Sequence, residues 1–134
     1  MSNKTVGTNP ASVASPMKPH YSNSIRTDSG PLLFIAGQVA LDADGKLVGE
    51  GDIRAQTTQV LENIRAIVAA NGGTMADIAQ VTVYVCDIEA FDSVSDIRES
   101  YFPSEGPASA IVEVSALAWP EFLIEIAAVA AFPS

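Results

Sequence analysis

The segment from residue 123 to 130 constrains the fold most, because it is a strand-length run of apolar residues that carries one charge. A run of this kind favours a β-strand, the last and the most apolar of this chain. Its one charged residue is Glu125. A buried carboxylate costs free energy unless it is paired, protonated or used, so Glu125 is the first candidate for a functional residue. The alternative is a structural carboxylate that faces outward or binds backbone where subunits meet.

Three further segments have the pattern of strands. After the turn at Gly30-Pro31, residues 32–36 are apolar and residues 37–41 continue them. Gly37 favours a bulge or a close approach of another group to the backbone. Valines alternate with other side chains over residues 81–86, which gives a strand with two distinct faces. Residues 110–114 are expected to form the next strand, with Glu113 facing outward or contacting a partner at an interface.

Two segments have helical spacing. Asp52 is expected to cap a helix over residues 53–71, with Gln56 outside its apolar face. A second helix follows Glu89 and is stopped by Pro103. The apolar face of the first helix comprises Ile53, Val60, Leu61, Ile64, Ile67 and Val68, and that of the second comprises Phe91, Val94, Ile97 and Tyr101.

The predicted order of elements is therefore ββαβαββ, an α/β (α+β) fold with two helices on one face of a single mixed sheet. The other sheet face is also apolar and has nothing in this chain to cover it. Such a face predicts oligomerisation. Residues 1–19, rich in Ser, Pro, Thr and Asn, are expected to form a flexible N-terminal arm, and residues 20–134 a single domain.

Charge and rare residues narrow the functional classes. The net charge of −9 disfavours nucleic acid as a partner, since phosphate contacts need clustered Lys and Arg. The chain has one cysteine, Cys86, and one histidine, His20, which argues against a disulfide framework and a metal site. We expect a buried Cys86 thiol, an exposed His20, no membrane segment and a cytoplasmic location.

Five segments, taken in order, resemble the YjgF/RidA family of reactive-intermediate deaminases over about residues 21–131. They are residues 33–38 (LFIAGQ), 56–64 (QTTQVLENI), 81–87 (VTVYVCD) with Phe91, 106–114 (GPASAIVEV) and 123–126 (LIEI). The resemblance implies a chorismate-mutase-like fold, assembled as a homotrimer with a central barrel and with small-molecule pockets between subunits. It also implies hydrolysis of imines and enamines to a ketoacid and ammonia, with no cofactor and no metal.

The resemblance also assigns site residues. Glu125 corresponds to the carboxylate that activates or orients water, and Tyr21 to a tyrosine of the first strand. Gly37 and Phe91 correspond to residues beside the substrate. Three positions depart from the family pattern: Ala36 replaces a serine, Ile111 replaces a cysteine, and Ser109 replaces the arginine that binds the substrate carboxylate.

The change at Ser109 bears on the substrate. A serine offers a carboxylate one neutral hydrogen bond, whereas an arginine offers a charged, bidentate interaction. We therefore expect a substrate that is less anionic than an iminoacid or is held differently, unless Arg26 supplies the missing charge. Tyr21 has two possible roles, hydrogen bonding to substrate or anchoring the arm. Trp119 lies in a loop, where it lines the pocket rim or a subunit contact.

Two functions from different classes remain. One is a divergent, cofactor-independent deaminase in which Glu125 is the general base. The other is a non-catalytic trimeric module that binds a small molecule. An endoribonuclease or translation inhibitor, a role also attached to the family by name, is disfavoured by the charge of −9 and by the lack of a histidine pair.

Overall fold

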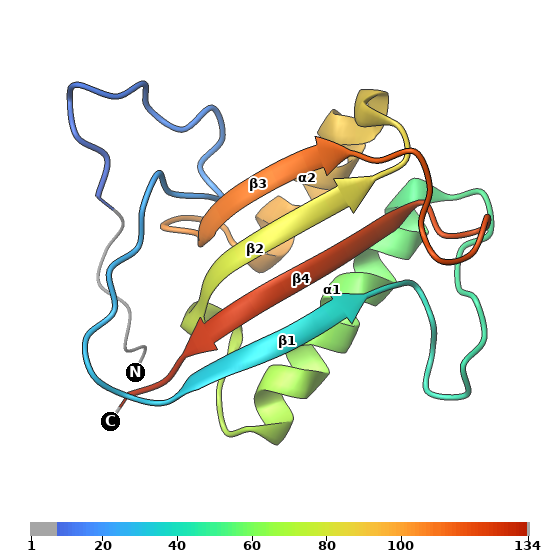
Figure 1. Cartoon of the computed structure of the whole chain (residues 1–134), viewed down its shortest axis with the longest axis horizontal. Coiled ribbons are helices and arrows are strands. Elements are labelled where there is room, and N and C mark those ends of the chain that lie inside the picture. The colour runs from blue at the N-terminus through green and yellow to red at the C-terminus, as the bar shows by residue number, and fades with distance from the viewer. Residues whose placement is uncertain (1–7, 134) are drawn as a thin grey trace.

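A computed structural model describes residues 8–133 of the chain. It contains one four-stranded sheet with two helices packed on the same face, so the predicted α+β class and mixed sheet are confirmed (Figure 1). Short 3₁₀ turns at Met75–Asp77 and Ile88–Ala90 connect the longer elements. These are β1 (Leu32–Gln38), α1 (Ile53–Ala70), β2 (Ile78–Val85), α2 (Phe91–Tyr101), β3 (Ala108–Glu113) and β4 (Ile124–Ala131).

The strand order β1-β4-β2-β3 places the most apolar strand, β4, inside the sheet. β4 runs antiparallel to both neighbours, whereas β2 and β3 are parallel. Along β4, Ile124, Ile126 and Ala128 are buried on the side that faces the helices. The alternate positions, which begin with Glu125, face the other side and are only half-buried.

The expected order ββαβαββ holds one strand more than the structure, in which β1 alone precedes α1 within residues 8–133. The segment of Tyr21, which the resemblance assigns to a first strand, forms only an isolated bridge, from Ser22 to Ala108. The predicted continuation over residues 39–41 is also not part of β1. A side chain of α1 contacts the backbone of residues 39–41. Asn63 donates from Nδ2 to the carbonyl oxygens of Val39 (3.2 Å) and Leu41 (3.0 Å), so a side chain satisfies backbone groups that a strand partner would otherwise satisfy.

The start of α1 confirms the predicted cap. The Oδ1 atom of Asp52 accepts from the amides of Arg54 (3.0 Å) and Ala55 (3.1 Å). The prediction for Gln56 was wrong, because this side chain is fully buried. It donates to the carbonyl oxygen of Glu121 (2.9 Å) and accepts from the amide of Leu123 (2.9 Å). Gln56 thus fixes the loop that leads into β4.

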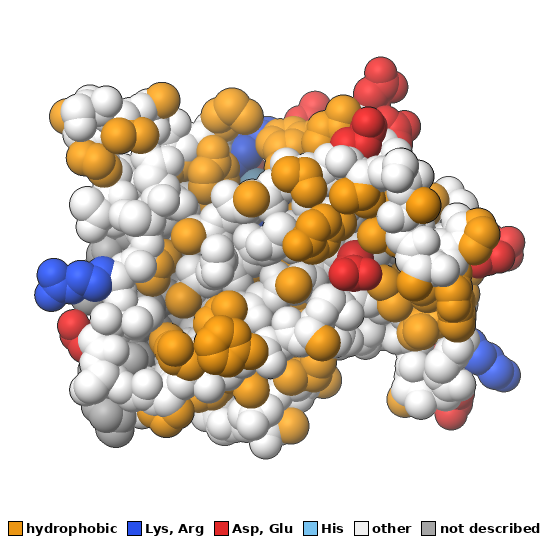
Figure 2. All heavy atoms as spheres, in the orientation of Figure 1, with side chains coloured by type: hydrophobic (Ala, Val, Ile, Leu, Met, Phe, Trp, Pro, Cys, Tyr) orange, Lys and Arg blue, Asp and Glu red, His pale blue; other side chains and the backbone are white. Residues whose placement is uncertain are grey.

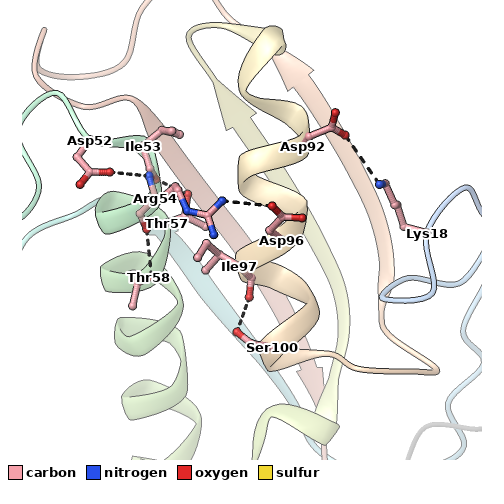
Figure 3. Close-up of polar contacts among 10 residues, drawn as sticks. All are labelled: Lys18, Asp52, Ile53, Arg54, Thr57, Thr58, Asp92, Asp96, Ile97 and Ser100. Atoms are coloured by element: carbon pink, nitrogen blue, oxygen red, sulfur yellow. Dashed lines mark hydrogen bonds and ion pairs between the residues drawn. The ribbon is translucent and has the colours of Figure 1, made fainter.

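The second helix is rotated relative to its expected orientation. Its buried residues are Val94, Ser95 and Arg98, while Ile97 and Tyr101 are half-buried beside α1. Arg54 of α1 pairs with Asp96 on the outer side of α2 (3.3 Å; Figure 3). This orientation turns Arg98 toward the sheet.

The sheet face opposite the helices is uncovered in the single chain, and we call it the open face. Phe34 is 74% exposed on it, and Leu32 and Val112 are also exposed. Figure 2 views the molecule from this side and shows apolar side chains spread over the strands, with few charged groups among them. No helix within residues 8–133 is both long and apolar enough to cross a membrane.

Of the predicted arm, residues 1–7 lie outside the described residues. The part that is described contacts the rest of the chain at several points. The amide of Thr8 donates to the carbonyl oxygen of Ser24 (3.1 Å). Lys18 pairs with Asp92 near the start of α2 (3.8 Å; Figure 3). Residues 16–21 are thereby held beside that helix.

Candidate functional site

Glu125 lies on the open face, directly opposite Tyr84 of β2, and its carboxylate rests against Gly37 of β1. The register of β1 shifts between Ile35 and Gln38, which is the bulge that Gly37 predicted. A Cβ atom at position 37 would lie 2.7 Å from Cδ of Glu125, closer than real Cβ contacts occur. The close approach predicted at Gly37 is therefore made by the Glu125 side chain. Ala36, the other bulge residue, is exposed.

A second group of predicted residues meets in a pocket of about 120 Å³ at the outer edge of the sheet. The pocket lies between β3, the inner side of α2 and residues 17–21. Tyr21, Phe91, Ser109 and Ile111 all line it, although they are far apart in the sequence. Its full lining comprises Met17, His20, Tyr21, Phe91, Arg98, Ser109 and Ile111. We call it the edge pocket.

A close crossing of two chain segments builds one wall of the edge pocket. Ser22 bridges to Ala108, and its amide donates to the carbonyl oxygen of Pro107 (3.1 Å). Its hydroxyl also donates to the carbonyl oxygen of Gly106 (2.8 Å). A Cβ atom at position 106 would overlap the carbonyl group of His20, so glycine is needed there for space. The crossing holds residues 20 and 21 beside β3.

Tyr21 combines the anchoring role with a place in the pocket. Its hydroxyl accepts a hydrogen bond from the amide of Met17 (2.9 Å), which fastens the preceding segment. Its ring contacts His20 edge to face, with 5.8 Å between the centroids. The same side chain lines the edge pocket. Its role toward a substrate remains a prediction.

The main residue that the sequence reading missed is Arg98, which is only 2% exposed. Its Nη2 atom donates to Oγ of Ser109 (2.7 Å), while its Nε–H has no partner. Burial lowers the pKa of Arg98 to about 10, so the guanidinium is still charged at neutral pH. The guanidinium of Arg98, on α2, therefore places a positive charge beside Ser109.

His20 contradicts the expectation of an exposed side chain, because it is 1% exposed. Its Nδ1 atom has no hydrogen-bond partner, and Oε1 of Glu99 lies 4.0 Å away. Burial, followed by the charges of Arg98 and Lys18, lowers the pKa of His20 to about 4. His20 is therefore neutral at physiological pH.

A sequence signal for Arg98 did exist. Phe91, Val94, Ser95 and Arg98 are spaced as one helical row, and three of the four are buried. Arginine and serine side chains are normally exposed to solvent. The more apolar face through Ile97 was therefore predicted to be the buried face of this helix.

The two groups of predicted site residues point to opposite faces of the sheet. Ser109 pairs with Val81, whose side chain is buried toward the helices. Glu125 pairs with Tyr84, which belongs to the alternate set of side chains on β2. β2 also separates β3 from β4. One chain therefore does not bring Glu125 and the edge pocket together.

The remaining candidates lie outside both groups. Arg26 has a side chain that is 80% exposed and lies 3.9 Å from Asp28, and it does not line the edge pocket of its own chain. Trp119 stacks on Phe122, with 4.7 Å between ring centroids. The thiol of Cys86 is half-buried near the carbonyl oxygen of Phe122. No cluster of three or more His, Cys, Asp or Glu suited to a metal ion occurs in residues 8–133.

Comparisons with known proteins place this geometry in a family. The family model described as Endoribonuclease L-PSP matches residues 12–132. A RutC family protein of Pyrococcus horikoshii is 44% identical over 110 residues, which are 82% of this chain and 85% of that protein.

Two solved structures extend the likeness to the fold. A Rid family protein of unknown function from Yersinia pestis, YyfB, has a TM-score of 0.89 and 35% identity, and the match covers 97% of this chain and 99% of the other. A member of the YjgF/YER057c/UK114 family from Mycobacterium tuberculosis has a TM-score of 0.66 and 30% identity, with 96% and 98% covered. The chain therefore belongs to the YjgF/RidA (Rid) family.

Proposed function

We propose that this protein is a cytoplasmic, cofactor-independent hydrolase that deaminates small imines and enamines. The observation that carries the proposal is the placement of Glu125. Its carboxylate lies on the open face, on a strand whose other residues are all apolar, in a space that Gly37 keeps free. A carboxylate held in such surroundings is suited to act as a general base on a water molecule.

The reaction balances without a cofactor. Glu125 takes a proton from water as the water oxygen attacks the imine carbon, and an enamine reacts after conversion to the imine. Glu125 returns that proton to the nitrogen, which gives a neutral carbinolamine. It then takes the proton of the new hydroxyl group and passes it to the nitrogen as the C–N bond breaks, so that ammonia leaves and a carbonyl product remains.

The proposal includes a homotrimer in which the active site forms between two copies. In one chain, Glu125 and the edge pocket lie on opposite faces of the sheet. The open face carries exposed Phe34 and Leu32, which a partner would cover. Packing the open face of one copy against the β3 edge of the next would bring Glu125 to Tyr21 and Ser109. A cyclic trimer repeats this contact three times and closes.

The second candidate is a binding module without catalysis. The edge pocket favours it, because that pocket holds a buried charge and two aromatic side chains without any contribution from Glu125. An endoribonuclease is disfavoured by the net charge of −9 and by the single histidine, His20, which is buried and neutral.

The test measures ammonia release from 2-aminoacrylate, generated in place by a pyridoxal-phosphate lyase, and from neutral imines. Wild type is compared with Glu125→Gln, which keeps the shape of the side chain and removes the base. The matched control is Glu121→Gln, an exposed position in the loop before β4. We expect wild type and the control to accelerate release, and Glu125→Gln to lose about 100-fold or more.

Two results would reject the deaminase. One is a wild-type rate equal to that of buffer with every substrate, which would leave the binding module. The other is an unchanged rate in Glu125→Gln, which would remove Glu125 from the mechanism. RNA cleavage by wild type above the level of Glu125→Gln would instead support the endoribonuclease.

A further inference from the structure

Residues 14–23 form a loop whose two ends are tied together. The Nδ2 atom of Asn23 donates to the carbonyl oxygen of Ala14 (2.9 Å). The end that leads into the domain is fixed firmly, because Ser22 is 4% exposed and bonds residues 106 and 107 through its hydroxyl and its amide. Residues 14–19 form no helix or strand, and the loop projects beyond the start of β3 (Figure 1). A loop with joined ends can move as a unit while the sheet stays intact.

Met17, at the far end of this loop, lies at the mouth of the edge pocket. Its side chain lines the pocket and yet the residue is 75% exposed, so Met17 stands between the cavity and solvent. The same residue lines a larger hollow of about 490 Å³, which leaves room for it to move away from the mouth. His20, by contrast, is 1% exposed. Met17 can therefore leave the mouth while residues 20–22 stay in place.

Two polar contacts hold the far end of the loop against the pocket. The amide of Met17 donates to the Tyr21 hydroxyl (2.9 Å). The Nζ atom of Lys18 pairs with Oδ1 of Asp92 (3.8 Å; Figure 3). The second contact joins the loop to α2, the helix that forms another wall of the pocket. The Asp92 side chain is 87% exposed, and an ion pair in such a position is weak and is screened by salt.

We propose that residues 15–19 form a lid over the edge pocket, with the Lys18–Asp92 pair as its latch and Met17 as the side chain that closes the mouth. The inference rests on the proposed function for what passes the lid, a small substrate or its product. The lid opens when the ion pair breaks, while Ser22 keeps its bonds to residues 106 and 107. Loss of either charge, or its screening, shifts the lid toward the open form.

The same helix supplies a matched control. Asp96 lies one turn after Asp92 and also forms an exposed ion pair, with Arg54 of α1 (3.3 Å). Figure 3 shows the two ion pairs on different sides of α2. Asp92→Asn and Asp96→Asn therefore remove the same charge and the same kind of contact from one helix, but only Asp92→Asn frees the loop.

The first experiment measures access to the pocket. Ile111→Cys places a thiol in the pocket, and Cys86→Ser removes the native one, which gives the parent protein for the comparison. Iodoacetamide alkylates this thiol: the sulfur displaces iodide, and the thiol proton goes to the buffer. At low salt we expect Asp92→Asn to raise the alkylation rate about 2- to 5-fold and Asp96→Asn to leave it unchanged. Equal rates in the parent and both variants would overturn the lid.

Salt and a charge exchange test the latch itself. Sodium chloride at about 0.5 M should raise the alkylation rate of the parent toward that of Asp92→Asn, and should leave Asp92→Asn unchanged. The exchange of charges in Lys18→Asp with Asp92→Lys should restore the slow rate of the parent. A charge exchange that alkylates as fast as Asp92→Asn would reject the ion pair as the latch and overturn the proposal.

Hydrogen exchange followed by NMR checks the lid in the full chain without the added thiol. In Asp92→Asn the Met17 amide should exchange faster, while the Ser22 amide keeps its protection. Faster exchange at both amides would mean that the whole crossing opens, and would overturn a lid confined to residues 15–19.

These measurements do not depend on ammonia release, so they separate the lid from the proposed function. Asp92-dependent alkylation in a protein that releases no ammonia would reject the deaminase and keep the lid. Alkylation that ignores Asp92 in a protein that does release ammonia would overturn the lid alone.

Discussion

The carboxylate of Glu125 occupies the space that a side chain at Gly37 would fill. The two residues come from neighbouring strands, and the bulge in β1 brings the Gly37 backbone to this position. The glycine is needed for room, since its backbone does not adopt the left-handed conformation. The Glu125 carboxylate can therefore take this position because Gly37, on the neighbouring strand, has no Cβ atom.

Gly37→Ala is expected to slow ammonia release by about 10- to 100-fold, because the new methyl group displaces the Glu125 carboxylate from its position. The melting temperature should fall by only a few degrees, since Glu125 is half-buried and its side chain can move. Initial rates and a thermal melt on the same preparation check both parts.

The control for Gly37→Ala is the double variant with Glu125→Gln. If the glycine acts through the carboxylate, it adds no further loss once the carboxylate is gone. Additive losses in the double variant would mean that position 37 affects the reaction by another route.

Ser109→Arg is expected to destabilise the protein rather than improve it. The new guanidinium would lie beside the buried Arg98, which already uses the Ser109 hydroxyl. Two like charges at one buried site should lower the free energy of unfolding by about 1–3 kcal/mol. Moving the charge, in Arg98→Ser with Ser109→Arg, should recover part of this loss. Denaturant titration of wild type, Ser109→Arg and the double variant tests this prediction. A Ser109→Arg protein as stable as wild type would contradict a buried charge at Arg98.

Acid should destabilise the protein partly through His20. Its pKa is about 4 in the folded chain and about 6.5 when unfolded, so only the unfolded chain takes up a proton between these values. Stability is therefore complete above pH 6.5 and is lost as the pH falls toward 4, by up to about 3 kcal/mol. His20→Gln should show a smaller loss between pH 7 and pH 5 than wild type in urea titrations. Identical losses would show that His20 titrates as an exposed residue.

Phe34→Asp should break the proposed trimer, because it places a charge at an apolar position of the open face. Light scattering should give a mass near three chains for wild type and near one chain for the variant. Val13→Asp changes an exposed apolar residue outside the sheet and serves as the control. A single-chain mass for wild type would reject the assembly.

Local patterns were enough to predict most of the fold. The alternation in β2, the cap at Asp52 and the glycine in β1 each depend on neighbours in the sequence, and each prediction was confirmed. Gly37 is the most informative case, because a glycine inside an apolar strand already implies that something approaches its backbone.

The edge pocket could not be predicted in the same way. It depends on the crossing of residue 20 over Gly106, a contact between distant parts of the chain. Burial of Arg98 depends on Ser109 and on the rotation of α2, and hydrophobicity assigns an arginine to solvent. Burial of a polar side chain can be predicted only when its hydrogen-bonding partner is known, and that partner lies elsewhere in the sequence.

The most direct test of the account combines two inactive variants, Glu125→Gln and Tyr21→Ala, in one preparation by refolding an equal mixture. If each site takes Glu125 from one copy and the edge pocket from the next, about a quarter of all sites in randomly assembled trimers have both native residues. The account therefore predicts recovery of about a quarter of the wild-type rate of ammonia release.

Wild type mixed equally with the double variant is the matched control, and sites shared between copies predict about a quarter of the wild-type rate there as well. No recovery in the first mixture, together with about half the wild-type rate in the second, would place the whole site within one chain and contradict the account.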